Sequence, residues 1–503
     1  MNHPAYILTV YLVLNSLVAL GTSQSDSTTS SVEILGLGST GSRTPFWNQT
    51  NQWGIVPTEN AVSIRGSRQH FWNLTTKNGS KTNWQAEAGG ELVGNISKNS
   101  QLILPQAYAA ISYKNWEFSA GRRKQWVGLA DSTLGTGSYI WSGNAIPIPR
   151  IQISLKEYSP VPYTRNWLAI KGFYADGWFD TNRPVTSQLK LHQKQLYGRI
   201  RKPGSWLTIY GGFNHQVQWG GRSPYLTIDG QMPKGFKDYL YMITGTNPRG
   251  SLDTTLVSDF DNSNRVGNHL GTIDMALEIQ GNNSTWFFYR QNIYEDGSLY
   301  FLTNIADGLN GLRIRRKNAV GRVFSISELT FEGLYTKSQG GPSFILKDDK
   351  KRGKDNYFNN SQVRDGWSYN GRTIGTPFIP PTSETIWKYP NYADFFTSNN
   401  RVWVLHTGMR GSFLNRYEWT TKLSYSSNIG VYDQPFPKTV YQFSGLLAVQ
   451  TKVNWLGGTV LKGSIATDIG ELYPNSTGIM LSLRKDWGFS GKNQEKGAST
   501  SID

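Results

Sequence analysis

The segment IDMALEIQ, residues 273–280, alternates large apolar side chains with polar or small ones. A period of two residues places successive side chains on opposite faces of a β-strand. The same alternation recurs at 151–156, 207–218, 419–425, 441–450 and 479–489. Such segments, separated by turn residues, are typical of a transmembrane β-barrel with lipid outside and polar groups inside. The pattern therefore predicts an all-β protein.

A soluble sandwich or propeller also alternates, so other features must decide between the two architectures. Aromatic residues stand near segment ends, where a membrane interface would lie, as with Trp167, Trp178, Trp206 and Trp286. Long polar connections span 222–266 and 338–400, and no internal repeat supports a propeller. At roughly 25 to 30 residues per strand and connection, the chain supplies about 16 to 18 strands. We predict an antiparallel transmembrane barrel of about 18 strands.

The N-terminus carries an apolar run at residues 5–21, followed by the polar segment TSQSDSTTSS. This order is typical of a signal peptide cleaved after Gly21 or Ser23. An uncleaved N-terminal anchor is the alternative. We expect a signal peptide at 1–23, a polar spacer at 24–31, the barrel at 32–489 and a disordered polar tail at 490–503. The chain has no cysteine, so no disulfide framework stabilises it.

Two segments depart from the strand pattern. GRRKQWVGLADSTLGTGSYIWSGNAIPIPR, residues 121–150, combines basic, aromatic and glycine residues without alternation, which predicts a loop folded inward or closing the mouth. PKGFKDYLYMITG, residues 233–245, places Phe236, Tyr239, Leu240 and Ile243 at helical spacing between a proline and a glycine. We expect this short helix to pack in the lumen or cap a mouth. A surface helix is the alternative.

The chain is basic, with 51 Lys and Arg against 35 Asp and Glu. Strand parity places most assignable cations inside the barrel: Lys156, Lys171, Arg199, Arg201, Arg313, Arg315, Lys422, Lys462 and Arg484. Fewer acids share that face, among them Asp274, Glu278 and Glu328. A basic lumen lined with aromatic residues suits an acidic polysaccharide or small anions. A ladder of ion pairs that merely fills the barrel is the alternative.

Catalytic and metal-binding patterns are weak. The six histidines are dispersed, and neither a zinc-ligand spacing nor a pair of catalytic acids stands out. A hydrolase that uses His215 or His192, or Asp131, is therefore a minor alternative. We expect no catalysis, no cofactor and no metal. Nucleic acid is not an expected partner, because no nucleic-acid module is present.

Several short sequence segments resemble the Wzi capsule-assembly family. They are residues 45–54 (PFWNQTNQWG), 121–149, 192–197 (HQKQLY), 213–221 (FNHQVQWGG) and 355–378 (DNYFNNSQVRDGWSYNGRTIGTPF). The resemblance implies an outer-membrane barrel of about eighteen strands in a Gram-negative bacterium. It also implies a lumen closed by loops and helical elements, and a lectin-like role in attaching or organising capsular polysaccharide.

The resemblance supplies no sugar-binding motif that can be transferred residue by residue. We choose as candidate polysaccharide contacts Arg122, Arg123, Trp126, Trp141, Asn144, Gln218, Trp219, Arg222 and Trp367. Stacking on aromatic rings and charge-assisted hydrogen bonds would carry the binding. The alternative is that the Trp, Gly and Asn residues only shape a plug. Expected partners are capsular or other acidic polysaccharide, outer-membrane lipid and the capsule export machinery. A diffusion channel for anions or sugars is the alternative function.

Overall fold

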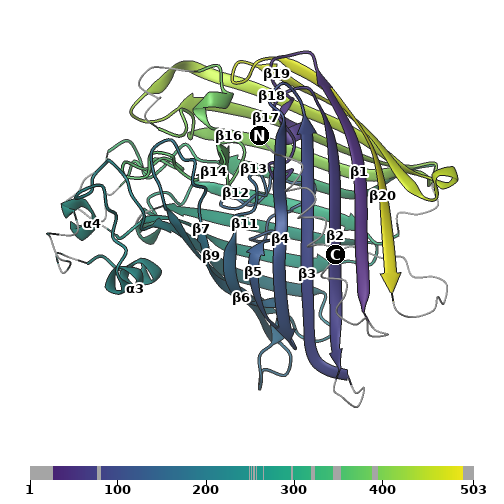
Figure 1. The fold of residues 1–503 in the computed structure, drawn as a ribbon, viewed down its shortest axis with the longest axis horizontal. Helices are drawn as coiled ribbons and strands as arrows, with labels where there is room; N and C mark the ends of the chain where they lie inside the picture. The colour runs from purple at the N-terminus through teal and green to yellow at the C-terminus, as the bar shows by residue number, and fades with distance from the viewer. Residues whose placement is uncertain are drawn as a thin grey trace, which may run out of the picture.

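The computed structural model describes residues 26–75, 81–248, 250, 252, 255, 258–263, 265–295, 298–318, 323–343, 353–387 and 395–490. Within these residues, 18 antiparallel strands form one sheet that closes into a barrel (Figure 1). Each strand pairs with its neighbours in the chain, and β20 pairs with β1 to close the ring. The predicted strand number and fold class are confirmed. The predicted signal peptide, 1–23, lies outside the described residues.

The barrel strands have the following bounds: β1 (Ser27–Ser39), β2 (Ala61–Thr75), β3 (Lys81–Ile96), β4 (Gln101–Tyr113), β5 (Trp116–Arg122), β6 (Arg150–Pro160), β7 (Leu168–Trp178), β8 (Lys190–Ile200), β9 (Leu207–Trp219), β10 (Asn268–Gln280), β11 (Ser284–Glu295), β12 (Gly308–Arg316), β13 (Phe324–Tyr335), β16 (Val402–Phe413), β17 (Tyr417–Gly430), β18 (Pro435–Val453), β19 (Thr459–Gly470) and β20 (Ser476–Ser490). Between β13 and β16 lies a small hairpin of β14 (Ser368–Tyr369) and β15 (Arg372–Thr373).

The first strand starts earlier than the sequence indicated. Ser27 pairs with Phe71 of β2 and with Ser490 of β20, so residues 27–31 of the predicted polar spacer belong to the barrel. The physical reason is ring closure: β1 must hydrogen-bond to a neighbour on both sides, and this partnership outweighs the weak strand signal of a Ser/Thr run. Of the predicted tail, residues 491–503 lie outside the described part.

The two ends of the barrel differ in their connections. Most connections at the end that we call the loop end are long, with the longest at 40–60, 123–149, 220–267 and 336–401. At the other end, the turn end, strands are joined by short turns such as 114–115, 201–206 and 414–416. β1 begins and β20 finishes at the turn end. Outer-membrane barrels keep short turns in the periplasm and long loops outside, so we assign the loop end to the cell surface.

The wall has an apolar outer face, as the alternation predicted. In β10, Ile273 and Met275 are 45% and 54% exposed and face outward, whereas Asp274 between them is buried inside. Neighbouring strands continue this outer face, with Phe213 on β9 and Phe288 on β11 both exposed. Within the described residues, no helix is long and apolar enough to cross a membrane.

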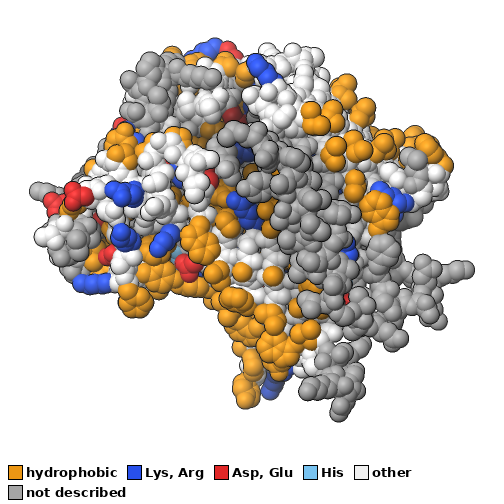
Figure 2. All heavy atoms as spheres, in the orientation of Figure 1, with side chains coloured by type: hydrophobic (Ala, Val, Ile, Leu, Met, Phe, Trp, Pro, Cys, Tyr) orange, Lys and Arg blue, Asp and Glu red, His pale blue; other side chains and the backbone are white. Residues whose placement is uncertain are grey.

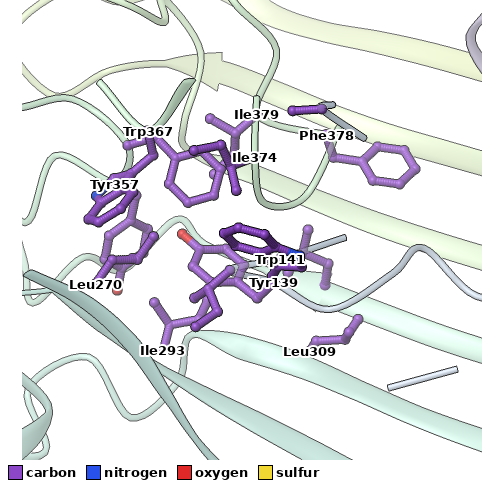
Figure 3. Packing of buried hydrophobic residues seen from close by; sticks show 14 of the residues in the cluster. Tyr139, Trp141, Leu270, Ile293, Leu309, Tyr357, Trp367, Ile374, Phe378 and Ile379 are labelled. Atoms are coloured by element: carbon purple, nitrogen blue, oxygen red, sulfur yellow. The ribbon is translucent and has the colours of Figure 1, made fainter. Parts of the chain in front are cut away.

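The lumen at the loop end is filled by the chain's own connections. The largest buried cluster joins residues of the connection 123–149, such as Tyr139 and Trp141, to residues of 336–401, such as Trp367 and Ile374 (Figure 3). The connection 40–60 contributes α2 (Phe46–Gln49), all four residues of which are buried. The predicted inward loop at 121–150 is therefore confirmed. We call these packed connections the plug.

The helix predicted at 233–245 forms, but it lies elsewhere than expected. α3 (Phe236–Thr244) packs outside the barrel wall, beside β7 and β9 at the loop end (Figure 1). Its Tyr239 Oη donates to Asp176 Oδ2 at 3.0 Å, and Asp176 is on the outer face of β7. The expectation that this helix fills the lumen or caps the mouth is wrong, because a single helical stripe cannot indicate which side of the wall it meets. α4 (Asp259–Ser263) follows in the same connection.

Candidate functional site

A groove opens at the loop end, above the plug. Its cavity volume is 1820 Å³, and its walls come from connections far apart in the chain. Lining segments are Val56–Glu59, Gln101–Leu104, Arg122, Asn182–Val185, Ser368–Arg372 and Pro381–Ile386, with Arg364, Asp365, Phe395 and Phe396. We call this the mouth groove.

The β14–β15 hairpin projects into the mouth groove. Its tip is Asn370-Gly371, with φ of 47° and 71°. An Asn-Gly pair with both φ angles positive is the preferred turn of a two-residue hairpin. The backbone N–H of Asn370 donates to Asp180 Oδ2 at 3.2 Å, which ties the tip to the β7–β8 connection. The tip thus presents an exposed amide side chain from a fixed backbone.

Arg183 holds the floor of the groove together. Its buried guanidinium donates to the carbonyl oxygens of Ser368 at 2.8 Å and Gly366 at 3.2 Å. It also pairs with the carboxylate of Asp180 at 3.2 Å. Because all these acceptors belong to the protein, Arg183 has a structural role and is not available to a ligand.

The carboxylates of the groove are also engaged by the protein. Asp365 Oδ2 accepts from the backbone N–H of Thr186 at 2.7 Å, and Glu384 pairs with Arg43 at 2.7 Å. The pKa of Glu59 lies below its ordinary value because Ser97 Oγ, first of all, and the Asn99 N–H donate to its carboxylate. Protein groups therefore already hydrogen-bond or pair with these carboxylates, which shape the groove.

Two groove arginines, Arg122 and Arg372, form no salt bridge within the described residues. Arg122 donates to the phenolic oxygen of Tyr369 at 2.8 Å and to the Leu104 carbonyl at 3.2 Å. Arg372 donates to the Val56 carbonyl at 2.7 Å. In the described part of the chain, neither has a carboxylate close enough for a salt bridge. Burial lowers the pKa of Arg372, and the nearby Glu384 carboxylate offsets only part of this effect. A guanidinium that hydrogen-bonds only to neutral groups can still donate to an anionic ligand.

Four of the nine predicted contact residues form the plug or contact it: Trp141, Asn144 and Trp367 lie in it, and Gln218 contacts it from β9. Trp141 and Trp367 are fully enclosed in its apolar core (Figure 3). Asn144 Nδ2 donates to the Thr373 carbonyl at 3.1 Å, and Gln218 Nε2 donates to the Gly366 carbonyl at 2.8 Å. These side chains join the connections to one another and to β9.

Arg123 and Trp126 lie along the wall of the lumen and do not line the mouth groove. Arg123 pairs with Glu87 at 2.9 Å and Glu117 at 3.0 Å, so its charge is compensated. Trp126 packs edge-on against Trp53 with ring centroids 5.2 Å apart. Trp126 nevertheless remains 53% exposed.

The remaining two predicted residues lie away from the lumen. Trp219 faces outward and packs against Tyr239 of α3, with ring centroids 5.2 Å apart. Arg222 is exposed at the start of the β9–β10 connection, where its backbone bridges to Ser187. Of the nine residues, only Arg122 lines the mouth groove. The nine are spread over different places and do not form one site.

The groove residues that sequence reasoning missed include Asp180, Arg183, Asn370 and Arg372. Two short segments rich in turn-forming residues could have indicated them: DTNRP at 180–184 and YNGR at 369–372. Turn residues placed between strands mark loops that can carry function. The sequence alone could not show that these two segments contact each other in the folded protein.

The inward cations divide into paired and unpaired groups. Lys156 pairs with Glu117 at 3.0 Å, Arg315 with Glu328 at 3.2 Å and Arg484 with Asp486 at 2.8 Å. Lys422 instead lies over the ring of Trp47, 4.6 Å from its centroid. An ion-pair ladder thus accounts for part of the basic interior. Among the described residues, no group of three or more His, Cys, Asp or Glu could hold a metal ion.

A closed antiparallel barrel with an apolar outer face, strand-length segments and a lumen filled by its own loops defines an integral β-barrel protein of the Gram-negative outer membrane. The chain belongs to the Wzi family, since residues 51–402 match the family described as Capsule assembly protein Wzi.

Solved structures resemble the fold. The carbohydrate-binding barrel Wzi of Escherichia coli, involved in group 1 capsule assembly, has a TM-score of 0.56 and 15% sequence identity, over 96% of this chain and 89% of that chain. OccAB4 of Acinetobacter baumannii has a TM-score of 0.46 and 10% identity, over 92% of this chain and 98% of that chain. At these identities the likeness concerns the fold. No curated protein sequence matches this chain significantly.

Proposed function

We propose that this protein binds capsular or other acidic polysaccharide in the mouth groove and holds it at the cell surface, in the manner of a lectin and without turnover. The observation that carries the proposal is the pair Arg122 and Arg372, two groove arginines whose hydrogen bonds go to neutral protein groups and that form no salt bridge within the described residues. A guanidinium donates paired hydrogen bonds to a carboxylate, which is the anionic group of many acidic sugars.

The rest of the groove lining suits a sugar chain. Asn182 and Asn370 offer amide donors and acceptors for hydroxyl groups, while the half-buried Phe395 and Phe396 offer rings on which sugar faces can stack. The cavity has a volume of 1820 Å³ and faces the side that we assign to the cell exterior.

The plug below the groove supports attachment over passage. Its core contains large side chains with almost no exposure, such as Tyr139, Tyr357 and Trp367. A polymer could not pass between them without displacing the connections. A diffusion channel, the competing function, would need an open path through this core. We propose that the groove receives polysaccharide from the capsule export machinery outside the barrel.

Deleting the gene in an encapsulated host and measuring capsule attached to cells against capsule shed into the medium tests the role in attachment. We expect the shed fraction to rise while total capsule stays constant. Unchanged attachment would refute the role. A glycan array with the detergent-purified protein then tests binding directly, and planar-bilayer recordings of the same preparation test the channel, for which we expect no stable open conductance.

A further inference from the structure

The outer wall beneath α3 carries side chains that a lipid-facing wall would not normally present. His192 on β8, His215 on β9 and His269 on β10 all face outward by strand parity. They are nevertheless buried, with His192 at 0% exposure. His215 Nε2 and His269 Nδ1 lie 2.9 Å apart in a hydrogen bond. The β9–β10 connection therefore folds down over the outside of the barrel and shields this polar patch.

α3 is fixed to the wall at several points. Met242 is completely buried and packs with Val217 and Trp219 of β9. Tyr239 Oη hydrogen-bonds to Asp176, and the ammonium of Lys194 on β8 donates to the Ile243 carbonyl at the last turn. A cation at a helix C-terminus stabilises the helix because it hydrogen-bonds to carbonyl groups that have no partner within the helix. The helix is thus a fixed part of the barrel exterior.

The opposite face of α3 is apolar and exposed. Phe236 is 78% exposed and Leu240 is 45% exposed. They stand four residues apart, which places them on one side of the helix, away from Met242. Lys234 and Lys237 flank Phe236 in the chain and are exposed as well. In a helix surrounded by water, an exposed Phe and Leu on one stripe would lack a partner.

The position of α3 along the barrel strands indicates what covers Phe236 and Leu240. Directly toward the turn end lie the exposed lipid-facing residues Leu196, Phe213 and Ile273. Phe213 is two residues from His215, roughly 7 Å along the strand. The helix therefore begins where the exposed apolar band stops. In Figure 2, hydrophobic side chains run along the lower edge from the position of α3 toward that of β6.

We propose that α3 lies in the outer leaflet of the outer membrane as an interfacial helix, with Phe236 and Leu240 among the acyl chains and Lys234 and Lys237 reaching the headgroup phosphates. Interfacial helices lie with their apolar face about 5–10 Å into the boundary between headgroups and acyl chains. Lysine side chains extend from such a position toward polar groups. The surface is continuous with the membrane-facing wall, so lipid is the occupant that the geometry favours over a protein partner.

The chain has no cysteine, so one nitroxide spin label can be placed at each chosen site. Leu240→Cys and Phe236→Cys report on α3. Ile273→Cys on the outer face of β10 provides the lipid reference, and Ser383→Cys in the mouth groove provides the aqueous reference. The labelled full-length protein is reconstituted in bilayers that contain lipid A in one set and phosphatidylcholine alone in another. Accessibility to oxygen, which concentrates in lipid, is compared with accessibility to a water-soluble nickel chelate.

We expect the oxygen-to-nickel ratio at positions 236 and 240 to match Ile273→Cys and to exceed Ser383→Cys several-fold. Nickel accessibility equal to that of Ser383→Cys at both positions would show that the helix stands in water and would overturn the proposal. Low accessibility to both reagents would also overturn it, because it would show that a second copy of the chain or another protein covers the stripe. Two labelled positions keep the test valid if one variant fails to fold.

Discussion

Gln218 and Trp219 are consecutive in the chain, yet they serve opposite sides of the barrel wall. Gln218 Nε2 donates to the Gly366 carbonyl of the plug at 2.8 Å, while the ring of Trp219 lies 5.2 Å from that of Tyr239 on α3. Alternation of side chains across a strand makes this division possible. The last residues of β9 therefore fix both the plug inside and the helix outside.

Replacing Trp219 by Ala should loosen α3 without disturbing the plug. The loss of an aromatic contact and of buried area under the helix costs on the order of 1–2 kcal/mol in local stability. We expect faster amide hydrogen exchange at residues 236–244, measured by mass spectrometry. Gln218→Ala is the matched control, which should speed exchange in the plug near Gly366 and leave α3 unchanged. Unchanged exchange at 236–244 in Trp219→Ala would contradict the docking role.

Replacing Trp367 by Ala should open the plug. Trp367 is fully buried in the cluster shown in Figure 3, and truncating a large core side chain costs about 3–5 kcal/mol. We expect intermittent conductance in planar bilayers where the parent protein is silent. Trp455→Ala, at an exposed turn-end position, should remain silent. If the Trp367 variant is silent as well, the plug is held by other contacts.

Replacing Arg122 by Ala should weaken binding of acidic glycans about tenfold, which corresponds to about 1.4 kcal/mol for one charge-assisted contact. Arg222→Ala is the matched control, since it removes an exposed arginine that does not line the mouth groove. Surface plasmon resonance at two salt concentrations measures the glycan affinities of both variants and of the parent protein. Equal affinities for both variants would exclude Arg122 from the site.

Asp261 should make the β9–β10 connection sensitive to pH. Burial raises the pKa of Asp261 to about 6, although Gln362 and Ser258 donate hydrogen bonds to its carboxylate. A carboxyl group whose folded pKa exceeds its ordinary value of 3.8 favours the folded state when protonated. That stability is fully present below about pH 3.8 and is lost as pH rises through about 6.

We expect α4 to exchange its amide protons faster at pH 7 than at pH 4 after correction for the intrinsic rate, with a difference on the order of 2 kcal/mol. Asp261→Asn, which resembles the protonated form, should remove this dependence. Asp259→Asn, two residues away in the same helix, is the control and should keep it. A pH dependence that survives in Asp261→Asn would assign the effect to another group.

Strand-level features followed from the sequence because they depend on local periodicity. The alternation at 273–280 gave the outward Ile273 and the inward Asp274, and the glycine-rich, non-alternating stretch at 121–150 indicated the inward loop. The mouth groove could not be found in this way. Asp180 and Asn370 meet at 3.2 Å although they are 190 residues apart, and no local pattern records that approach.

By itself, the sequence determined which segments would be strands with one apolar face and that a helix would form within residues 233–245, because both depend on the spacing of apolar side chains along a short stretch. Aromatic residues at the segment ends and long polar connections then favoured a membrane barrel over a soluble sandwich. Only the tertiary structure decided on which side of the wall that helix lies, and which groove arginines hydrogen-bond to neutral groups in place of a salt bridge. The reason is physical: an apolar stripe packs equally well against a lumen or an outer wall, and a charge is compensated by neighbours that folding brings from distant parts of the chain.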